Sequence, residues 1–313
     1  MRTGQKLSPK GRVSLIDTQA AAERATQRGR GAVSNQTGRF ERETRFAFDD
    51  GWDTIEQDAT RIETLVMPET ARTVITFNRS PDISFDRTIN PYRGCEHGCI
   101  YCFARPSHAF HGLSAGLDFE SRLFYKTNAI RQLEWELSRP GYLCRPIALG
   151  MNTDAYQPIE RTYQMTRQVL EVLAAHNHPV SLLTKSALIQ RDIDLLAPMA
   201  GKGLVRAGVS ITTLDRALSR KMEPRAATPQ RRLETVRALS EAGIPVTVMT
   251  APIIPALNDH EIEAVLEAAA AHGAGGAGYV LLRLPHEIKD LFHEWLVQHV
   301  PDRAAIVINT MRD

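Results

Sequence analysis

Short apolar runs alternate with amphipathic segments of helical period along most of the chain. The short runs, rich in β-branched residues and typical of buried strands, cover residues 85–89, 146–151, 180–184, 205–211, 245–250 and 279–284. The segments with helical spacing cover residues 128–138 with Asn128 as the N-cap, 162–175, 188–199, 229–241, 259–272 and 287–299. This alternation predicts repeated βα units and a parallel sheet.

The repeated βα units predict an α/β fold, and their number is compatible with two architectures, a partial barrel and a doubly wound sheet. About six βα units are too few for a closed eight-unit barrel and suit a partial (β/α)6 barrel. A doubly wound sheet would give the same linear pattern. In both architectures ligands bind at the carboxyl ends of the strands, so we expect the functional residues in the loops that follow the strands.

The segment GAGGAG at residues 273–278 matches the spacing of a dinucleotide-binding fingerprint. It follows a predicted helix and precedes a predicted strand, which is the reverse of the order that brings a helix N-terminus to a phosphate. We interpret the segment as a helix C-cap followed by a flexible turn.

Composition indicates a globular protein with a distinct N-terminal part. The chain has 313 residues, of which 43% are hydrophobic and 24% charged, and a formal net charge of +2. Residues 1–50 are basic and contain few large apolar side chains, so we expect a partly disordered N-terminal extension at 1–79 and one domain at 80–313. The basic residues are interpreted as a solvated tail, with a nucleic-acid-binding arm as the alternative.

The chain lacks the apolar segments that direct proteins to membranes. No apolar run approaches the roughly 18 residues that span a bilayer, and the first residues lack the apolar stretch of a secretory signal. We therefore expect a cytoplasmic protein with no membrane partner. In a reducing compartment, closely spaced cysteines hold a metal or perform redox chemistry more often than they form disulfides.

The segment NPYRGCEHGCIYC at residues 90–102 carries three of the four cysteines, Cys95, Cys99 and Cys102. Gly94 and Gly98 prevent a regular helix and allow a tight turn, so that the three thiols can converge on one point. A [4Fe–4S] cluster is normally held by four thiolates, and three would leave one iron open for chemistry.

A zinc site is the alternative for the same cysteines. Its fourth ligand would come from His97, His108 or His111. Zinc sites usually pair two close cysteines with a distant second pair, however, and the remaining cysteine, Cys144, has no companion. The three histidines are otherwise interpreted as structural residues of the loop.

The C-x3-C-x2-C spacing, with Tyr101 before the third cysteine, resembles the signature of the radical S-adenosylmethionine (SAM) superfamily. Further segments resemble its branch related to spore photoproduct lyase: GRGAVSNQTGRFE at 29–41, TDAYQPIE at 153–160, LLTKS at 182–186, GVSITT at 208–213 and APIIPALND at 251–259. The resemblance implies a partial barrel, a [4Fe–4S] cluster on the three cysteines, and SAM bound to the open iron.

The resemblance also implies a reaction and its partners. Reductive cleavage of SAM yields a 5′-deoxyadenosyl radical, which abstracts hydrogen from a substrate that the sequence does not identify. The electron would come from a low-potential donor such as flavodoxin or ferredoxin, and nucleic acid is a candidate substrate. The rival interpretations are a zinc-binding nucleic-acid module and an iron–sulfur electron carrier.

Candidate SAM contacts are carried over by motif. GMNTD at 150–154 stands where many members carry a Gly-Gly-Glu-type segment, and there we choose Thr153 and Asp154. The alternative for Asp154 is a cap on the following turn. Lys185 ends a predicted buried strand, where an ammonium needs a carboxylate partner, either that of SAM or one of the protein.

Two further contacts follow from the same resemblance. Ser210, on the fourth predicted strand, would contact the ribose or methionine part of SAM, and the alternative is a serine that satisfies a neighbouring strand. Tyr101 would act through its backbone near the adenine, with its ring covering the cluster.

One position argues against repair of spore photoproduct. In spore photoproduct lyase, a cysteine just before a Thr-Ser-Asp segment returns a hydrogen atom to the substrate radical, and the corresponding residue here is Met151. A thioether has no S–H to donate. Cys144 lies near the opposite end of the same predicted strand, and Tyr156, a conceivable donor, is more often a packing residue in such a turn. We therefore expect SAM cleavage without efficient repair.

Overall fold

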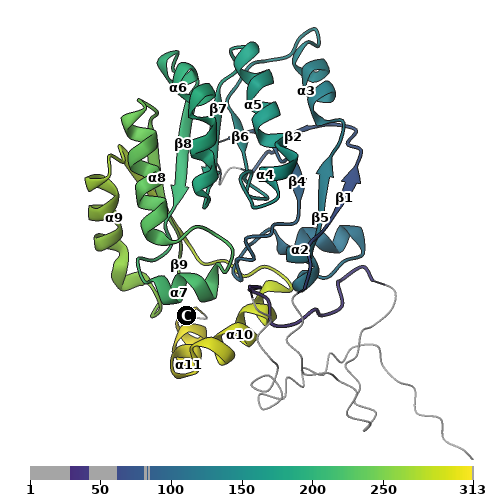
Figure 1. The fold of residues 1–313 in the computed structure, drawn as a ribbon. Coiled ribbons are helices and arrows are strands. Elements are labelled where there is room, and N and C mark those ends of the chain that lie inside the picture. Colours follow the sequence, from purple (N-terminus) through teal and green to yellow (C-terminus); the bar gives the residue numbers. More distant parts are fainter. Residues whose placement is uncertain (1–28, 42–61, 81–82, 84, 312–313) are drawn as a thin grey trace, which may run out of the picture.

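The structure is a computed structural model that describes residues 29–41, 62–80, 83 and 85–311. Its centre is a sheet of six parallel strands, with a short antiparallel strand β2 (Ile75–Phe77) at one edge (Figure 1). The parallel strands, in their order across the sheet, are β3 (Arg87–Ile89), β6 (Ile147–Leu149), β7 (Val180–Thr184), β8 (Val205–Ser210), β9 (Val246–Ile253) and β10 (Gly276–Leu281).

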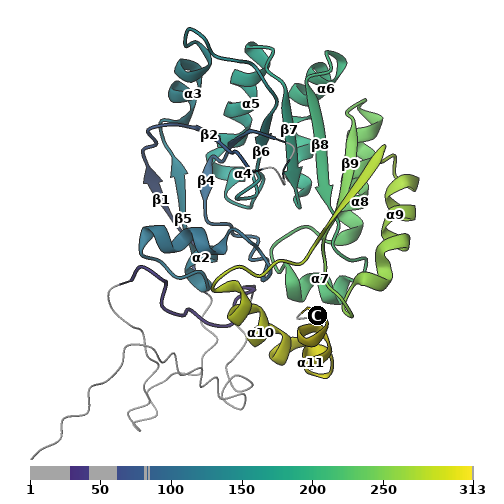
Figure 2. The same ribbon diagram turned by 180° about the vertical axis from the view of Figure 1, so that it is seen from behind.

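Helices connect these strands and gather on one face of the sheet, as the two opposite views show (Figures 1 and 2). The covering helices are α3 (Ala129–Leu137), α5 (Met165–Ala175), α6 (Ile193–Gly201), α8 (Pro229–Glu241) and α9 (Ile262–Ala271). Short helices fill the loops: α2 (Leu117–Ser121), α4 (Glu160–Tyr163), α7 (Arg216–Met222), η1 (Arg105–His111), η2 (Ala187–Asp192) and η3 (Asp259–Glu261).

The order of the strands decides between the two predicted architectures. The parallel strands follow one another across the sheet in sequence order, whereas a doubly wound sheet reverses direction at a switch point. Sequential order with helices on one face is the arrangement of an open βα barrel wall. The predicted α/β class with a parallel sheet is therefore confirmed, and the doubly wound alternative is excluded.

The predicted strands and helices are all present, and most of them differ from the predicted ranges at one or both ends. Residues 180–184 and 229–241 match β7 and α8 at both ends. The interpretation of residues 273–278 is wrong in its second half, because β10 begins at Gly276, and only the preceding glycines form the turn after α9. Glycine lowers the strand signal, but pairing with β9 supplies the backbone hydrogen bonds.

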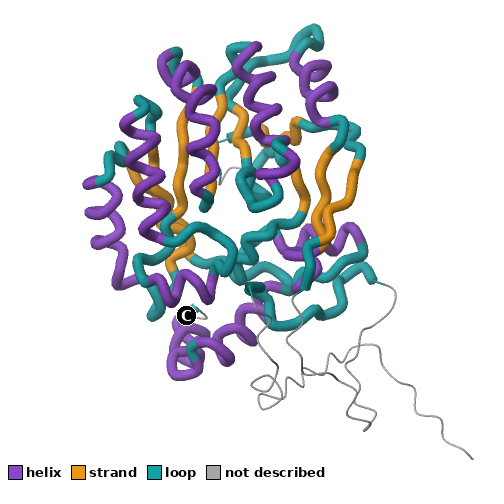
Figure 3. The backbone as a smooth tube through the Cα atoms, in the orientation of Figure 1, coloured by secondary structure: helices purple, strands orange, loops and turns teal. Residues whose placement is uncertain are grey.

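A second, three-stranded sheet was not predicted from the sequence. Strand β5 (Arg122–Lys126) lies between β1 (Leu65–Glu69), which is parallel to it, and β4 (Tyr92–Arg93), which is antiparallel (Figure 3). These strands are short and partly exposed, so they lack a clear alternating pattern. The sheet joins the start of the cysteine segment to residues from the predicted N-terminal extension.

The prediction of disorder at the N-terminus concerns residues that lie mostly outside the described part of the chain. Within that part, residues 29–41 pack against the rest of the protein. Arg30 donates to the carbonyls of Glu120 and Ile62, and Ser34 donates to Glu294. The predicted boundary at residue 79 stays a prediction.

The described residues form two main hydrophobic clusters. The larger lies between the parallel sheet and its helices. The second lies at the carboxyl ends of the strands, where α10 (Ile288–His299) and α11 (Pro301–Thr310) pack below the parallel sheet (Figure 1). Cys99, Ile100 and Tyr101 belong to this second cluster. No described helix combines the length and apolarity needed to cross a bilayer.

Candidate functional site

The cysteine segment leaves β4 and forms a compact loop at the carboxyl ends of the parallel strands. Gly94 and Gly98 have φ angles of 70° and 68°, so both adopt the left-handed conformation that glycine allows without steric cost. Turn hydrogen bonds join Gly98 N to Cys95 O at 3.3 Å and Cys102 N to Cys99 O at 3.2 Å. The predicted tight turn is therefore present.

The three thiols of this loop interact with one another. Burial raises the pKa of Cys95 well above its usual value, and the nearby charges of Asp154, Cys99 and Cys102 raise it further. Burial also raises the pKa of Cys99 to about 12, although Lys185 acts in the opposite direction. Cys144, by contrast, is exposed and lies before β6, away from the loop. Cys95 and Cys99 are therefore protonated here and would lose their protons to a bound metal group.

The three neighbouring cysteines are a donor set that suits a [4Fe–4S] cluster with one open iron. Among the described residues, no group of three or more His, Cys, Asp or Glu side chains is arranged to hold one ion. A zinc ion needs four ligand atoms within about 2.3 Å. A [4Fe–4S] cluster would instead bind each thiolate to a different iron. It therefore needs three neighbouring thiols and not four ligands around a single ion.

The histidines near the cysteines have other partners, as the structural interpretation predicted. His97 Nδ1 lies 3.3 Å from Asp154 Oδ2. His108 Nε2 is 2.8 Å from the carbonyl oxygen of Arg122, and burial lowers its pKa to about 4. His111 stacks on Phe124 with ring centroids 5.0 Å apart.

The buried ion pair of Arg105 and Glu120 holds the cysteine loop in place. Arg105 donates from Nε to Cys99 O at 2.9 Å and from Nη2 to Gly98 O at 3.1 Å, and it also contacts Glu120. Glu120 accepts hydrogen bonds from the backbone N–H groups of Gly31 and Ala32 at 2.9 and 2.8 Å. One carboxylate therefore ties the N-terminal segment and the cysteine loop together. Both side chains are completely buried.

Thr153 and Asp154 follow β6 and face the cysteine loop. Thr153 donates to Tyr92 O at 3.1 Å. Asp154 Oδ1 accepts from Thr184 Oγ1 at 2.7 Å and from Tyr156 N at 2.9 Å, while Oδ2 accepts from Lys185 N at 2.8 Å. The turn-capping alternative for Asp154 is thus observed, and its contact with SAM stays a prediction.

Lys185 lies directly after β7 and faces Tyr101. Its Nζ is 5.8 Å from the centre of the Tyr101 ring, and no ion pair to it occurs within the described residues. Burial of its ammonium lowers the pKa of Lys185, but the nearby acidic groups of Cys99 and Glu223 outweigh burial and raise it above its usual value. The side chain is therefore an ammonium on a half-buried residue, without a carboxylate in contact.

A buried network that the sequence did not reveal holds Tyr101. The Tyr101 hydroxyl donates to Glu223 and lies 3.2 Å from Thr212 Oγ1, and Thr212 also donates to Glu223 at 2.8 Å. Arg232, from α8, forms an ion pair with the other oxygen of Glu223. The predicted position of the Tyr101 ring near the cysteines is consistent with this packing, in which the hydroxyl fixes the ring.

Ser210 ends β8 and is buried beside this network. Its carbonyl oxygen accepts from Arg232 Nη1 at 3.0 Å. The ends of β6, β7 and β8 therefore bring Thr153, Lys185 and Ser210 to the edge where the cysteine loop lies. Sequence reasoning missed Thr212 and the buried charged residues Glu120, Glu223 and Arg232. Isolated charged residues in loops and helices are usually solvated, so nothing in the sequence indicated that these three are buried.

Residues 89–269 match the model of the radical SAM superfamily. Uncharacterised proteins of Mycobacterium bovis and Mycobacterium tuberculosis are 38% identical to the chain over 225 residues, which are 71% of this chain and 66% of theirs. An uncharacterised protein of Methanocaldococcus jannaschii is 30% identical over 173 residues, which are 55% of this chain and 62% of that protein. The matches therefore span slightly less than two thirds of the relatives' length.

The fold is similar to that of spore photoproduct lyase. A variant of that enzyme with bound SAM and dinucleoside spore photoproduct aligns with a TM-score of 0.56 at 16% identity, over 75% of this chain and 67% of the other. At this identity the likeness concerns the fold. Together with the family match over more than half of the sequence, it leads to one conclusion: the chain belongs to the radical SAM superfamily.

Proposed function

We propose that the protein is a radical SAM enzyme that holds a [4Fe–4S] cluster on Cys95, Cys99 and Cys102. The observation that carries the proposal is that Cys102 packs against the buried clusters that contain Cys95 and Cys99, while Lys185 Nζ lies 5.8 Å from the ring of Tyr101 in the same loop. Three protein ligands suit a cluster with one open iron, and the half-buried cation suits an anionic group of a bound cofactor.

When bound, the cluster and SAM supply a 5′-deoxyadenosyl radical that abstracts a hydrogen atom. The residues of the chain itself bind SAM and orient it in the site. Lys185 pairs with the SAM carboxylate, because a partly buried ammonium without a counterion is costly. Thr153 and Ser210 offer polar groups after β6 and at the end of β8, the strands on either side of β7, and Tyr101 covers the site from the loop. Asp154 holds the start of the Lys185 segment through the backbone N–H of Lys185.

The burial of the site supports a reaction that excludes water. Cys95, Cys99, Tyr101 and Thr153 each expose less than a tenth of their surface, and the second hydrophobic cluster lies behind them. Exclusion of solvent protects a reactive intermediate from side reactions. The electron comes from a low-potential carrier such as a flavodoxin or ferredoxin. Nucleic acid is our candidate substrate class, drawn from the lyase variant that shares the fold and carries a dinucleoside ligand.

The test is SAM cleavage by protein reconstituted with iron and sulfide without oxygen. We expect 5′-deoxyadenosine to form when SAM and dithionite are both present, together with broad visible absorbance from the cluster. Cys99→Ala should lose the cluster iron and the product, whereas the matched control Cys144→Ala should keep both, because Cys144 is exposed and outside the loop.

Three outcomes would favour other functions. Normal iron loading of Cys99→Ala would contradict the ligand assignment. Stoichiometric zinc in place of iron would favour the zinc-binding module. A cluster that cycles between redox states but never cleaves SAM would favour the electron carrier.

A further inference from the structure

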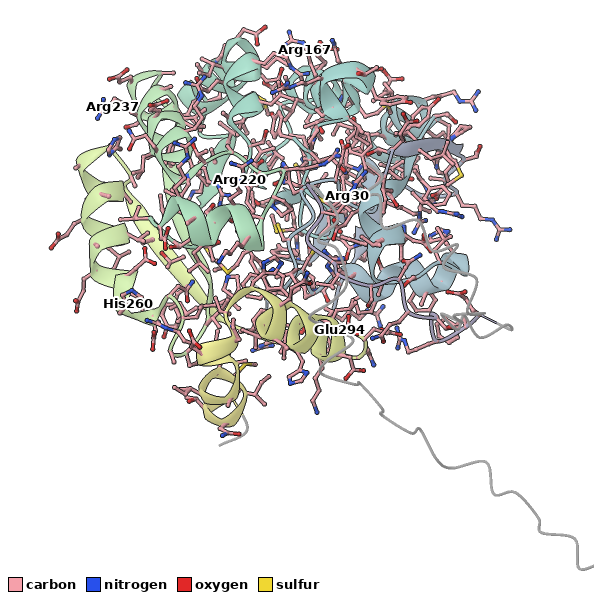
Figure 4. All side chains as sticks on the ribbon, turned by 60° about the horizontal axis from the view of Figure 1, so that its bottom comes forward. Arg30, Arg167, Arg220, Arg237, His260 and Glu294 are labelled. Atoms are coloured by element: carbon pink, nitrogen blue, oxygen red, sulfur yellow. The ribbon has the colours of Figure 1, made fainter. Side chains whose placement is uncertain are left out.

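A basic cleft lies on the outer side of the cysteine loop. It has a volume of about 420 Å³ and is formed by residues 29–33, α7 and the end of α10. Its lining includes Arg30, Arg220, Lys221 and His299, and none of the described residues that line it is acidic. Arg30 is buried and donates to the carbonyls of Glu120 and Ile62, and burial lowers the pKa of His299. The exposed positive charge of the cleft therefore comes from Arg220 and Lys221. Figure 4 shows Arg220 on α7 and Arg30 on the N-terminal segment. The cleft does not include the candidate SAM contacts.

The outer face of α7 extends this positive surface. Arg216, Arg220 and Lys221 are exposed, and the helix, RALSRKM, contains no acidic residue. Within the described residues, none of these three side chains forms an ion pair, and Lys221 Nζ donates to the His299 carbonyl at 3.1 Å. Unpaired exposed charges of one sign attract a surface of the opposite sign.

The inner face of α7 contacts the cysteine loop. Leu218 and Met222 pack with Cys99 and Ile100 in the second hydrophobic cluster. Ile100 N also donates to Met222 O at 3.0 Å. A route of covalent bonds and one hydrogen bond therefore leads from exposed Lys221, through Met222 and Ile100, to the proposed cluster ligand Cys99.

We propose that the surface formed by Arg216, Arg220, Lys221 and the cleft docks an acidic one-electron donor protein. This inference rests on the proposed function. One electron leaves the reduced flavin or iron–sulfur centre of the donor and enters the cluster on the cysteine loop, and no bond forms or breaks between the two proteins. The positive charge selects an acidic carrier, and the contact of α7 with Ile100 brings that carrier close to Cys99.

Position favours an electron donor over a nucleic acid at this surface. The candidate SAM contacts Thr153, Lys185 and Ser210 lie at the strand ends, whereas the cleft is lined by the N-terminal segment, α7 and α10. The cleft and the candidate SAM contacts share no residue, so a substrate in the cleft would not meet the residues proposed to hold SAM. A donor needs only proximity to the cluster, which α7 provides.

The test is the affinity of the full-length, reconstituted protein for an acidic flavodoxin, measured by titration calorimetry at low and moderate salt. The variant is Arg220→Glu with Lys221→Glu. The control is Arg131→Glu with Arg237→Glu, which makes the same change in net charge at exposed sites on α3 and α8. We expect the variant to bind about tenfold more weakly or worse, the control to stay within about twofold, and salt to weaken wild-type binding.

A second measurement separates this inference from the proposed function. SAM cleavage driven by dithionite should be unchanged in the variant, while cleavage driven by reduced flavodoxin should fall in parallel with affinity. Failure of wild-type protein to cleave SAM with dithionite would count against the proposed function, and the binding titration would still report on docking. Equal flavodoxin affinity in variant and wild type would overturn the docking proposal. So would undetectable wild-type binding, or a variant that loses affinity only for single-stranded DNA.

Discussion

At the scale of single residues, the site depends on charges that the fold has removed from water. Glu223 and Arg232 are both almost completely buried and form an ion pair that also holds the Tyr101 hydroxyl. Breaking such a pair by removing one partner leaves an uncompensated charge in the interior. The pair therefore fixes both the side chain of Tyr101 and the surroundings of Lys185.

Glu223 should make folding sensitive to acid. Burial raises its pKa, but Arg232 and Lys185 outweigh burial and lower the pKa from 4.5 to about 2. Because the folded-state pKa is depressed, the stabilisation is complete above about pH 4.5 and is lost as the pH falls towards 2. Urea unfolding across this range should show that Glu223→Gln loses this pH dependence and, at neutral pH, about 3–5 kcal/mol of stability. An exposed control, Glu267→Gln, should behave as wild type. An unchanged acid profile in Glu223→Gln would refute this account.

Lys185 should contribute to cofactor binding and not to cluster assembly. Loss of a charged hydrogen bond in Lys185→Ala should weaken SAM binding by on the order of 1.5–3 kcal/mol. Iron content should stay at the wild-type level, because the lysine is not a cluster ligand. Calorimetry of SAM binding to iron-loaded protein measures this, with exposed Lys202→Ala as the control. Unchanged SAM affinity would show that Lys185 has only a structural role.

At the scale of elements, the N-terminal segment and the cysteine loop are packed backbone against backbone. A Cβ on Gly31 would lie 1.8 Å from the carbonyl oxygen of Gly98, a position that no side-chain movement can relieve. Glu120 holds both segments in this contact. Residues 29–41 thus act as a support for the loop, although they are far from it in sequence.

Gly31→Ala should therefore disturb the cluster loop. We expect a loss of about 1–3 kcal/mol in stability, as in other overpacked interiors, and reduced iron loading. Gly201→Ala is the matched control, because a Cβ at Gly201, in α6, meets no atom within 4 Å. That control should be neutral or stabilise by about 0.4–1 kcal/mol. Thermal unfolding and iron analysis of both variants give the answer, and wild-type values for Gly31→Ala would contradict the packing argument.

At the scale of the whole molecule, the likeness to spore photoproduct lyase concerns the fold and leaves the substrate open. Met151 follows β6 at the carboxyl edge, at the position that the motif resemblance assigns to a hydrogen-donating cysteine. Cys144 is exposed and precedes the amino end of the same strand. Tyr156 is buried in the main core, as expected for a packing residue.

The protein should therefore cleave SAM without efficient repair of spore photoproduct. A thioether has no hydrogen to return to a substrate radical, and the thiol of Cys144 lies at the wrong end of β6. Incubation of the reduced enzyme with SAM and dinucleotide spore photoproduct, followed by chromatography, tests this. 5′-Deoxyadenosine without thymidylyl-thymidine is the expected result. Conversion as fast as that of a true lyase would prove the prediction wrong.

The sequence by itself determined the elements whose signals are local. Hydrophobic period predicted the strands and helices of the parallel sheet, because each buries one continuous face. The spacing of Cys95, Cys99 and Cys102 indicated the cluster loop, because ligands this close in sequence, with glycines between them, can converge on one point.

Only the tertiary structure decided which charges and backbones meet. Strand order excluded the doubly wound sheet, because linear alternation is the same in both folds. Glu223 pairs with Arg232, and Glu120 pairs with the backbone of residues 31–32. The segments joined in this way share no sequence pattern that would reveal the contact. Such contacts depend on burial, and a charged side chain gives no sign in the sequence of whether the fold will leave it in water or bury it against a partner.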